Sequence, residues 1–277
     1  MRPRSKIGLG CLSIFLIVFL YRVLSVYQFR AGDCVADPVP RVVTPTYPKR
    51  LLVMTYNVQG HAALVKSEHM AAIAETIREA KPDIVGINEA HKNTWQSRFK
   101  DHVEQLSAVT GMNVVFGESY GQMGGQFGNA ILTRGQIVKH EVYKLPGAGE
   151  PRTLLKATIR IDGGTVDFYV THLAAWEKFN RASRANQLDC LARHVRSSDH
   201  PYILAGDLNA PPEAPEIKDF RQDNALQICG PTDSTHRVMN LTIDYIFADR
   251  GWKVAFARTL ETGPSDHKPV IAELTHD

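Results

Sequence analysis

The chain has 277 residues, with 32 Lys and Arg against 29 Asp and Glu, and a sequence pI of about 8.6. Five of the basic residues and no acid lie in residues 1–30, so the remainder carries 32 − 5 = 27 basic against 29 acidic residues. This near-neutral remainder excludes a broad basic surface of the kind that binds nucleic acid without sequence preference, although it permits a local basic patch.

The first thirty residues differ in kind from the rest. An apolar run from Ile7 to Tyr21 follows three basic residues, and a mostly apolar piece continues beyond Arg22. The run is long for a signal core, and if Arg22 snorkels to the interface the extended segment reaches the roughly 20 residues of a spanning helix. We predict an uncleaved membrane anchor over 1–30, with a signal peptide cleaved after Ser25 as the alternative. In either case the chain that follows is expected on the periplasmic or extracellular side, and secreted if cleaved.

A linker is predicted between the anchor and the rest of the chain. Residues 31–49 are rich in proline from Asp37 onward and are expected to be extended. Residues 50–277 suit one large catalytic domain, without a second linker or an internal repeat. Of the four cysteines, Cys34 lies just beyond the apolar run, and an oxidising compartment would permit one bridge. For the distant pair, Cys190 and Cys229, a disulfide and two buried free thiols are equally compatible with the sequence.

Two strands and two helices are predicted in the first part of the domain. Apolar runs at Leu51–Tyr56 and Asp83–Ile87 predict buried strands, the second of which ends in Asn88 and Glu89. Ser67 is expected to cap a helix that continues to about Ala80. A second amphipathic helix is expected over Thr94–Val109, with Gly111 as its stop. Its apolar face would be formed by Trp95, Phe99, Val103 and Leu106.

The rest of the chain is strand-like, apart from one helix expected over Arg181–Val195. A glycine-rich loop is expected at 121–128, and Gly163-Gly164 predicts a hairpin turn. The predicted strands are Asn113–Phe116, Asn129–Thr133, Ile137–Leu145, Leu154–Ile161, Thr165–Thr171, Tyr202–Ala205, Ile243–Phe247, Lys253–Leu260 and Lys268–Leu274. Strands outnumber helices and polar clusters lie in the loops, which predicts stacked sheets with helices outside.

The stretch YILAGDLNAPP, from Tyr202 to Pro212, shows how this chain presents polar groups. An apolar strand stops at a glycine and delivers Asp207 and Asn209, which point to the same side because they are two residues apart. Taken alone, the stretch is equally compatible with a strand entering a turn. The same design recurs at other strand ends: Asn57, Glu89, His172, Asp244, and Asp266 with His267. Because buried carboxylates are costly unless they are paired or bound to a cation, this recurrence indicates a site for a hard divalent cation such as Mg²⁺.

Six short motifs occur in the order typical of one enzyme superfamily. They are TYNV from Thr55, INEA from Ile87, THL from Thr171, GDLN from Gly206, IDYIF from Ile243 and SDHKP from Ser265. The series, over about residues 51–274, resembles the endonuclease/exonuclease/phosphatase superfamily, the metal-dependent phosphoesterases that include deoxyribonuclease I. The resemblance implies an α+β fold, a four-layer α/β/β/α sandwich of two packed, mostly antiparallel sheets with helices outside.

The resemblance also implies a metal site and an attacking water. Glu89 would be the main ligand of Mg²⁺, or of Mn²⁺ in its place, with Asn57 and Asp266 assisting. Asp207 would orient or deprotonate the water, and Asn209 would hold a phosphate oxygen. These roles fit in-line displacement at phosphorus, which needs an activated water and neutralised phosphoryl oxygens. For Asn57, capping a turn is the structural alternative.

The remaining roles concern charge on the phosphoryl group. His267, polarised by Asp244, and His172 would stabilise that charge or assist the leaving oxygen. Arg152 resembles an arginine that contacts phosphate in some members, and its alternative is a solvated charge at the start of a strand. Asn129, in GNAIL, is expected to be a structural turn residue.

The superfamily shares a reaction and differs in substrates, so the motifs do not choose one. Ala205 and Ala210 flank GDLN where inositol phosphatases carry an aromatic residue and an arginine, which disfavours that subgroup. The leading prediction is a Mg²⁺-dependent phosphodiesterase, most simply an exported nuclease tethered by its N-terminal helix. The alternatives are a sphingomyelinase-like phospholipase C, which would suit a tether, and a catalytically silent binding module.

The expected partners are a phosphodiester, nucleic acid or phospholipid, and a membrane; no protein partner is inferred. A basic and aromatic segment that could contact nucleic acid is formed by Trp176, Lys178, Phe179, Arg181 and Arg184.

Overall fold

The computed structural model describes residues 30–34, 45–64, 66–175, 177–223, 226–231, 233–261 and 263–276. All of the predicted anchor except Arg30 lies outside these ranges, as do residues 35–44 of the predicted linker and Trp176. Within the described part of the chain, no helix is long and apolar enough to cross a membrane. Anchor and linker therefore stay predictions.

One six-stranded sheet has the strand order β11-β12-β1-β2-β4-β3. In this sheet β1 and β2 are parallel, and every other neighbouring pair is antiparallel. Its strands are β1 (Arg50–Asn57), β2 (Ile84–Lys92), β3 (Asn113–Gln122), β4 (Gly125–Thr133), β11 (Lys253–Thr259) and β12 (Val270–Thr275).

The second six-stranded sheet has the order β5-β6-β7-β8-β10-β9. Here β7 and β8 are the parallel pair, and the remaining neighbours are antiparallel. Its strands are β5 (Gln136–Lys144), β6 (Thr153–Ile161), β7 (Gly164–His172), β8 (Tyr202–Asp207), β9 (Leu226–Gly230) and β10 (Asp244–Asp249).

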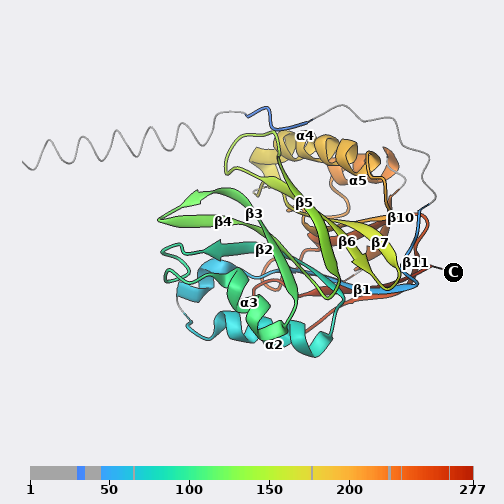
Figure 1. The fold of residues 1–277 in the computed structure, drawn as a ribbon. Helices are drawn as coiled ribbons and strands as arrows, with labels where there is room; N and C mark the ends of the chain where they lie inside the picture. Colours follow the sequence, from blue (N-terminus) through green and yellow to red (C-terminus); the bar gives the residue numbers. More distant parts are fainter. Residues whose placement is uncertain are drawn as a thin grey trace, which may run out of the picture.

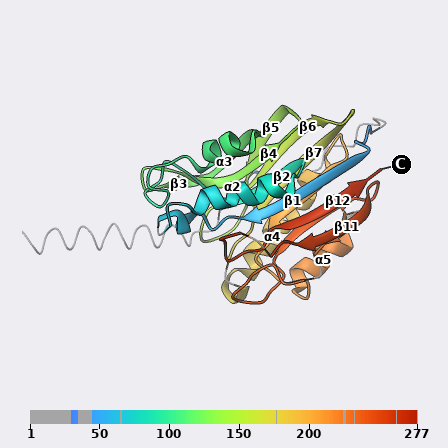
Figure 2. The same ribbon diagram turned by 90° about the horizontal axis from the view of Figure 1, so that it is seen from below.

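Helices cover the outer faces of both sheets. Figures 1 and 2 show α2 and α3 outside the first sheet, and α4 and α5 outside the second. The helical elements are the 3₁₀ helix η1 (Gly60–Leu64) and the α-helices α2 (His69–Ala80), α3 (His102–Thr110), α4 (Glu177–Arg196) and α5 (Pro215–Asp223). The predicted four-layer α/β/β/α sandwich is confirmed.

The core has three apolar layers because both faces of each sheet are covered. Val53 and Phe168 pack between the two sheets, whereas their strand neighbours Met54 and Tyr169 point outward under the helices. Side chains alternate across a strand, so a strand buried on both faces needs a continuous apolar run rather than an alternating one. This requirement is why the central strands were readable from the sequence.

Four local predictions were wrong. The helix predicted from Thr94 begins only at His102, because Asp101 accepts hydrogen bonds from the N–H groups of Val103 and Glu104 and so forms the N-cap. Residues 95–99 are turns, and the side chains of Trp95 and Phe99 are 51% and 63% exposed.

The second wrong prediction is the cap of α2. Ser67 does not cap the helix, because its hydroxyl donates to Glu68 and the N-cap position is Glu68. The third is the glycine-rich loop at 121–128. Most of it belongs to β3 and β4, and the turn between these strands is at Met123 and Gly124. Asn129, expected in a turn, lies buried in β4. The elements η1, α5 and β9 were not foreseen.

The cysteine pairing also differs from both alternatives. Cys34 forms a disulfide with Cys190 of α4, and Cys229 is free and buried. The bridge joins residues 156 positions apart. It fastens the segment 30–34 to the domain, so part of the predicted linker is attached to the sandwich.

Candidate active site

The strand-end residues meet at one edge of the sandwich. The parallel register places Asn57 opposite Asn88, and His172 opposite Asp207, while Asp244 at the start of β10 also pairs with Asp207. A cavity of about 420 Å³ opens at this edge. Seven of the nine residues predicted for the site line it: Glu89, Arg152, His172, Asp207, Asn209, Asp266 and His267. The remaining two, Asn57 and Asp244, are buried beside it.

Asp207 lies at the centre of this group. Its Oδ1 accepts the backbone N–H of Asn209 at 2.8 Å, and its Oδ2 accepts the amide of Asn57 at 3.0 Å. Burial and the neighbouring carboxylate of Asp244 raise the pKa of Asp207 to about 7, although His267 acts in the opposite direction. Asp207 is buried between the strands because Gly206 lets β8 lie close to β7. A Cβ on residue 206 would lie 1.9 Å from the carbonyl oxygen of Thr171.

Asn57 bridges two carboxylates. Besides Asp207, its Nδ2 faces Glu89 Oε1 at 3.3 Å, and its Oδ1 accepts the backbone N–H of Gln59 at 3.0 Å. The amide nitrogen therefore points into the acidic group and the oxygen points to the backbone. Its role as a metal ligand stays a prediction.

His267 is held by a buried carboxylate, as the sequence predicts. Its Nδ1 lies 2.9 Å from Asp244 Oδ2, and its Nε2 lies 3.8 Å from Asp207 Oδ2. Burial lowers the pKa of His267, but the charge and hydrogen bond of Asp244 outweigh this effect and raise it to about 10. The backbone N–H of Asp244 donates to Thr235 Oγ1 at 3.1 Å, which fixes the start of β10. The imidazole is therefore a cation at neutral pH.

His172 approaches Asp207 from β7. Its Nε2 lies 3.5 Å from Asp207 Oδ2, and its buried Nδ1 has no hydrogen-bond partner. Burial, together with the positive charge of Arg152, holds the pKa of His172 well below its ordinary value. The two histidines around Asp207 thus differ in charge at neutral pH: His267 is protonated and His172 is neutral.

Glu89 stands at an irregularity of β2. The register with β4 shifts between Ile87 and Ala90, and Glu89 has a left-handed φ of 61°. A bulge of this kind re-aims a side chain, here into the cavity. Burial alone would raise the pKa of Glu89, but the hydrogen bond with His61 and the positive charge of His267 outweigh it and lower the pKa to about 2. The carboxylate is therefore ionised at neutral pH.

His61 is a site residue that sequence reasoning missed. Its Nδ1 lies 3.5 Å from Glu89 Oε2. The contact depends on Gly60, where a Cβ would lie 2.1 Å from the carbonyl oxygen of Glu89, so that only glycine lets η1 approach β2 this closely. The Gly-His pair that follows TYNV could have indicated it.

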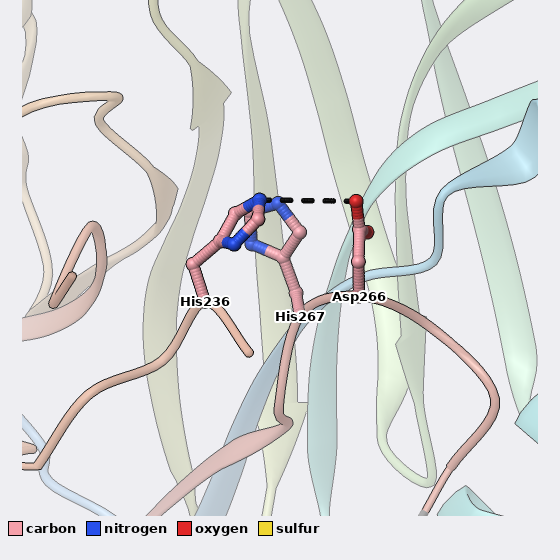
Figure 3. A group of neighbouring side chains, drawn as sticks. All are labelled: His236, Asp266 and His267. Carbon is pink, nitrogen blue, oxygen red and sulfur yellow. Dashed lines mark ion pairs between the residues drawn. The ribbon is translucent and has the colours of Figure 1, made fainter. Parts of the chain in front are cut away.

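Asp266 and a second missed histidine complete the rim. Gln59 Nε2 donates to Asp266 Oδ2 at 3.0 Å, and His236 Nε2 lies 3.8 Å from the same oxygen. Figure 3 shows the rings of His236 and His267 beside each other and the Asp266 carboxylate facing them. The ring centroids are 4.7 Å apart with an interplanar angle of 65°. His236 follows no predicted strand, so nothing in the sequence pattern marked it.

These contacts agree with the comparison to known proteins. The model of the Endonuclease/Exonuclease/phosphatase family matches residues 54–267. The chain belongs to this family. A stretch of 93 residues, 32% of the chain, is 37% identical to a UPF0294 protein of Yersinia pseudotuberculosis and spans 35% of that protein. The chain thus matches about a third of the length of this curated relative.

Solved structures show the family fold. The human Nocturnin catalytic domain, with a bound sulfate anion, has a TM-score of 0.69 and 21% identity, over 84% of this chain and 96% of that chain. D. rerio TDP2, complexed with single strand DNA product, has a TM-score of 0.68 and 16% identity, over 82% and 99%. At these identities the likeness concerns the fold.

The family is metal-dependent, and the cavity offers ligands for a metal. Glu89 and Asp266 present carboxylate oxygens, which suit a hard divalent cation. Within the described ranges, two groups have donor atoms within 4.8 Å of one another: His236 with Asp266 and His267, and Asp207 with Asp244 and His267. Glu89 belongs to neither group. The donor chemistry therefore fits the family's metal.

Arg152 is not a solvated charge at the start of a strand, which was the alternative to a phosphate contact. Only 6% of its side chain is exposed, and it lines the cavity beside His172. Its Nη1 contacts Glu150 Oε1 at 3.0 Å, and its buried Nε has no hydrogen-bond partner. A buried guanidinium that is only partly paired is available to an anion in the cavity.

Proposed function

We propose that this family hydrolase is a metal-dependent phosphodiesterase, a nuclease that uses an activated water for in-line attack at phosphorus. The observation that carries the proposal is the environment of Asp207. A buried carboxylate with a raised pKa lies between a neutral and a protonated histidine, 3.5 and 3.8 Å away, and beside a cavity of about 420 Å³. The DNA product held by TDP2, which has the same fold, supports nucleic acid as the substrate.

Asp207 would take the proton of the attacking water. A general base works best when its pKa is close to the working pH, and the pKa of Asp207 is about 7. Asn57 and the backbone N–H of Asn209 hold its two oxygens at 3.0 and 2.8 Å, so the carboxylate is oriented before substrate arrives. The Asn209 side chain donates to the carbonyl oxygen of Leu173 at 3.0 Å, which fixes that loop beside the phosphate position.

The cationic groups would neutralise the phosphoryl oxygens. His267 carries its proton at Nε2 while Asp244 holds Nδ1, so it can donate to a phosphoryl or leaving oxygen. Arg152 supplies a second positive charge. His172, neutral and with one ring nitrogen near Asp207, would orient the water or a phosphoryl oxygen.

We assign the metal to Glu89 and Asp266, with Asn57 assisting through its amide, which faces Glu89 Oε1 at 3.3 Å. When bound, a Mg²⁺ or Mn²⁺ ion would neutralise charge on the phosphoryl oxygens. With its pKa lowered to about 2, Glu89 needs no deprotonation to act as a ligand at neutral pH. Because His61 lies 3.5 Å from Glu89, we expect it to orient that carboxylate.

We also propose that the domain is exported and tethered by residues 1–30. The disulfide between Cys34 and Cys190 supports export, since disulfides persist in oxidising compartments. The apolar run of the first thirty residues supports the tether.

A second candidate is a phospholipase C that acts on lipid head groups. It is favoured by exposed apolar side chains on loops at the cavity: Trp95 and Met123 lie next to the lining residues Gln96 and Gln122, and Met239 lines the cavity itself. Their side chains are 51%, 64% and 51% exposed, and such a rim could enter a lipid surface. A silent binding module is the third candidate.

One parallel assay separates the candidates. The full chain, purified in detergent with Mg²⁺, is incubated with plasmid DNA, RNA, sphingomyelin in mixed micelles and bis-p-nitrophenyl phosphate, alongside Glu89→Ala and His267→Ala. Hydrolysis of DNA or RNA that is lost in both variants supports the nuclease. Hydrolysis of lipid alone overturns it in favour of the phospholipase. If no substrate turns over with Mg²⁺ or Mn²⁺, the binding module is the function to pursue, and Asp207→Ala should then retain the partner.

A further inference from the structure

A second cavity adjoins the active site. Its volume is about 300 Å³, and its lining includes Arg30, Asp33, Ser119 and Lys144. Arg152 lines this cavity as well as the active-site cavity, so the two cavities share one residue. The second cavity therefore borders the active-site cavity at Arg152.

One wall is built by a segment that precedes the family match. Arg30 exchanges two backbone hydrogen bonds with Gly147, both of 2.9 Å, and the N–H of Asp33 donates to the carbonyl oxygen of Lys144 at 2.7 Å. The disulfide of Cys34 closes the segment onto α4. The wall is thus fixed covalently and by hydrogen bonds, although it lies outside residues 54–267.

The charges of this second cavity favour an anion. Arg30, Lys144 and Arg152 contribute three positive charges, whereas Asp33 contributes one negative charge to the lining. The Asp33 carboxylate already accepts the backbone N–H of Lys144 at 2.9 Å. Arg30 donates from Nη1 to the carbonyl oxygen of Gly149 at 2.9 Å, which holds its guanidinium at the cavity.

The partial pairing of Arg152 points the same way. Its ion-pair partner Glu150 is 42% exposed, so water screens that pair, and the Arg152 Nε has no partner. A guanidinium that is 6% exposed and incompletely paired is costly unless a ligand completes its contacts. Because Arg152 lines both cavities, that ligand can be a phosphate in either one.

We propose that the second cavity is a subsite for a neighbouring phosphate of the substrate strand. The proposal rests on the nuclease function and deepens it, because it names a polyphosphodiester as the substrate class. A strand whose scissile phosphate lies beside Asp207 would place its next phosphate against Arg30 and Lys144. A substrate with one phosphodiester group would leave the subsite unused. The subsite therefore makes the enzyme prefer oligonucleotides to small phosphodiesters.

The test compares two substrates of the full chain. The ratio of kcat/KM for a single-stranded DNA 12-mer to kcat/KM for bis-p-nitrophenyl phosphate is measured for the unmodified chain and for Arg30→Gln/Lys144→Gln. The matched control is Lys218→Gln/Arg250→Gln, which removes two positive charges from a groove beside α5. We expect the ratio to fall about 10- to 100-fold in the subsite variant and to stay within about twofold in the control.

Two further readouts depend on phosphate contacts. The slope of log kcat/KM against log salt concentration for the 12-mer should become shallower by about 0.7 in the subsite variant, the value expected for the loss of one phosphate contact on a single strand. Asp33→Asn should raise the substrate ratio severalfold, because the amide removes a negative charge and its oxygen can still accept the Lys144 N–H. A folding defect would not produce this gain.

The outcomes separate the subsite from the function on which it rests. Equal losses in the subsite and control variants, with DNA still cleaved, overturn the subsite alone. Failure of the unmodified chain to cleave the 12-mer, with plasmid DNA and RNA also left intact, overturns the nuclease function and the subsite with it.

Discussion

Two regions of the molecule contain a buried arginine, and the two arginines differ in how completely their guanidinium groups are paired. Between α4 and α5, Arg184 is fully buried and donates from Nε and Nη2 to Glu216 Oε1 at 3.0 and 2.9 Å, and from Nη1 to the carbonyl oxygen of Ala174 at 3.1 Å. At the active-site edge, Arg152 has an exposed partner and an unpaired Nε. A buried charge that is fully paired serves the fold, whereas one left incompletely paired beside a cavity is reserved for a ligand.

The buried carboxylates of the two regions also differ in their partners. Glu216 faces a buried arginine, whereas Asp207 lies beside a second carboxylate, Asp244, which helps to raise the pKa of Asp207. Ionisation of Asp207 therefore opposes folding while it prepares the proposed base. If this contrast is right, substitutions at the cavity edge should change activity more than stability, and substitutions between α4 and α5 should do the reverse.

The largest effect is expected for Asp207→Asn. The amide cannot take a proton from water, so kcat on DNA should fall about 10³- to 10⁴-fold, which corresponds to roughly 4–5 kcal/mol. At pH 8 the Tm should change little, because removal of the charge beside Asp244 offsets the one hydrogen bond that the amide can no longer accept. Activity assays and thermal unfolding measure the two quantities, with Asp219→Asn on the exposed face of α5 as the control. A marked fall in Tm would show that Asp207 serves the fold.

Arg184→Met should produce the opposite pattern. It leaves the buried Glu216 with only the exposed Arg181, whose Nε lies 3.4 Å from Oε2, so the free energy of unfolding should fall by about 3 kcal/mol in chemical denaturation. The activity of the molecules that remain folded should be kept. The matched variant Arg152→Met should cost only about 1 kcal/mol of stability, since the partner it abandons is exposed. Equal losses of stability in the two variants would remove the contrast between the regions.

The disulfide joins the two regions, because Cys190 lies on α4 and Cys34 follows the wall of the subsite. Cys34→Ser should lower the free energy of unfolding by about 2–4 kcal/mol, since the bridge constrains a long loop of the unfolded chain. It should also lower the preference for the DNA 12-mer. Denaturation with and without reductant measures the first effect, and reductant should leave the variant unchanged. A wild-type chain insensitive to reductant would contradict the bridge.

The four-layer sandwich and seven of the nine predicted site residues that line the cavity could be predicted from the sequence. Buried strands are continuous apolar runs, and their polar ends are conspicuous because nothing else in the run is charged. The polar ends of β2, β7 and β8 therefore indicated which side chains would meet.

Other features depend on contacts that no local pattern contains. The start of α3 is set by Asp101, a capping residue within a stretch that otherwise has helical periodicity. His61 and His236 reach the site from η1 and from a loop, so their positions depend on how those segments fold back. The partner of Cys190 is 156 residues away, and loop closure at that distance leaves no trace in the sequence.

The smallest effect concerns a histidine that belongs to the fold. His102 is 1% exposed and its Nε2 has no partner, so burial, aided by the nearby His91, lowers its pKa to about 3. An unfolded histidine has a pKa of about 6.5, so below that pH only the unfolded chain readily takes up the proton. The resulting stability is present above pH 6.5 and is lost as the pH falls towards 3. His267, whose pKa is raised, contributes with the opposite sign.

We therefore expect His102 to account for a loss of about 1–2 kcal/mol in unfolding free energy between pH 7 and pH 5. His102→Asn removes the titrating imidazole. It keeps an acceptor for the backbone N–H of His91, which donates to His102 Nδ1 at 3.4 Å. Chemical denaturation at the two pH values should give a smaller acid-induced loss for this variant than for the wild type. An identical loss would mean that the acid sensitivity arises from other groups, such as His91, whose pKa burial lowers to about 4, and not from His102.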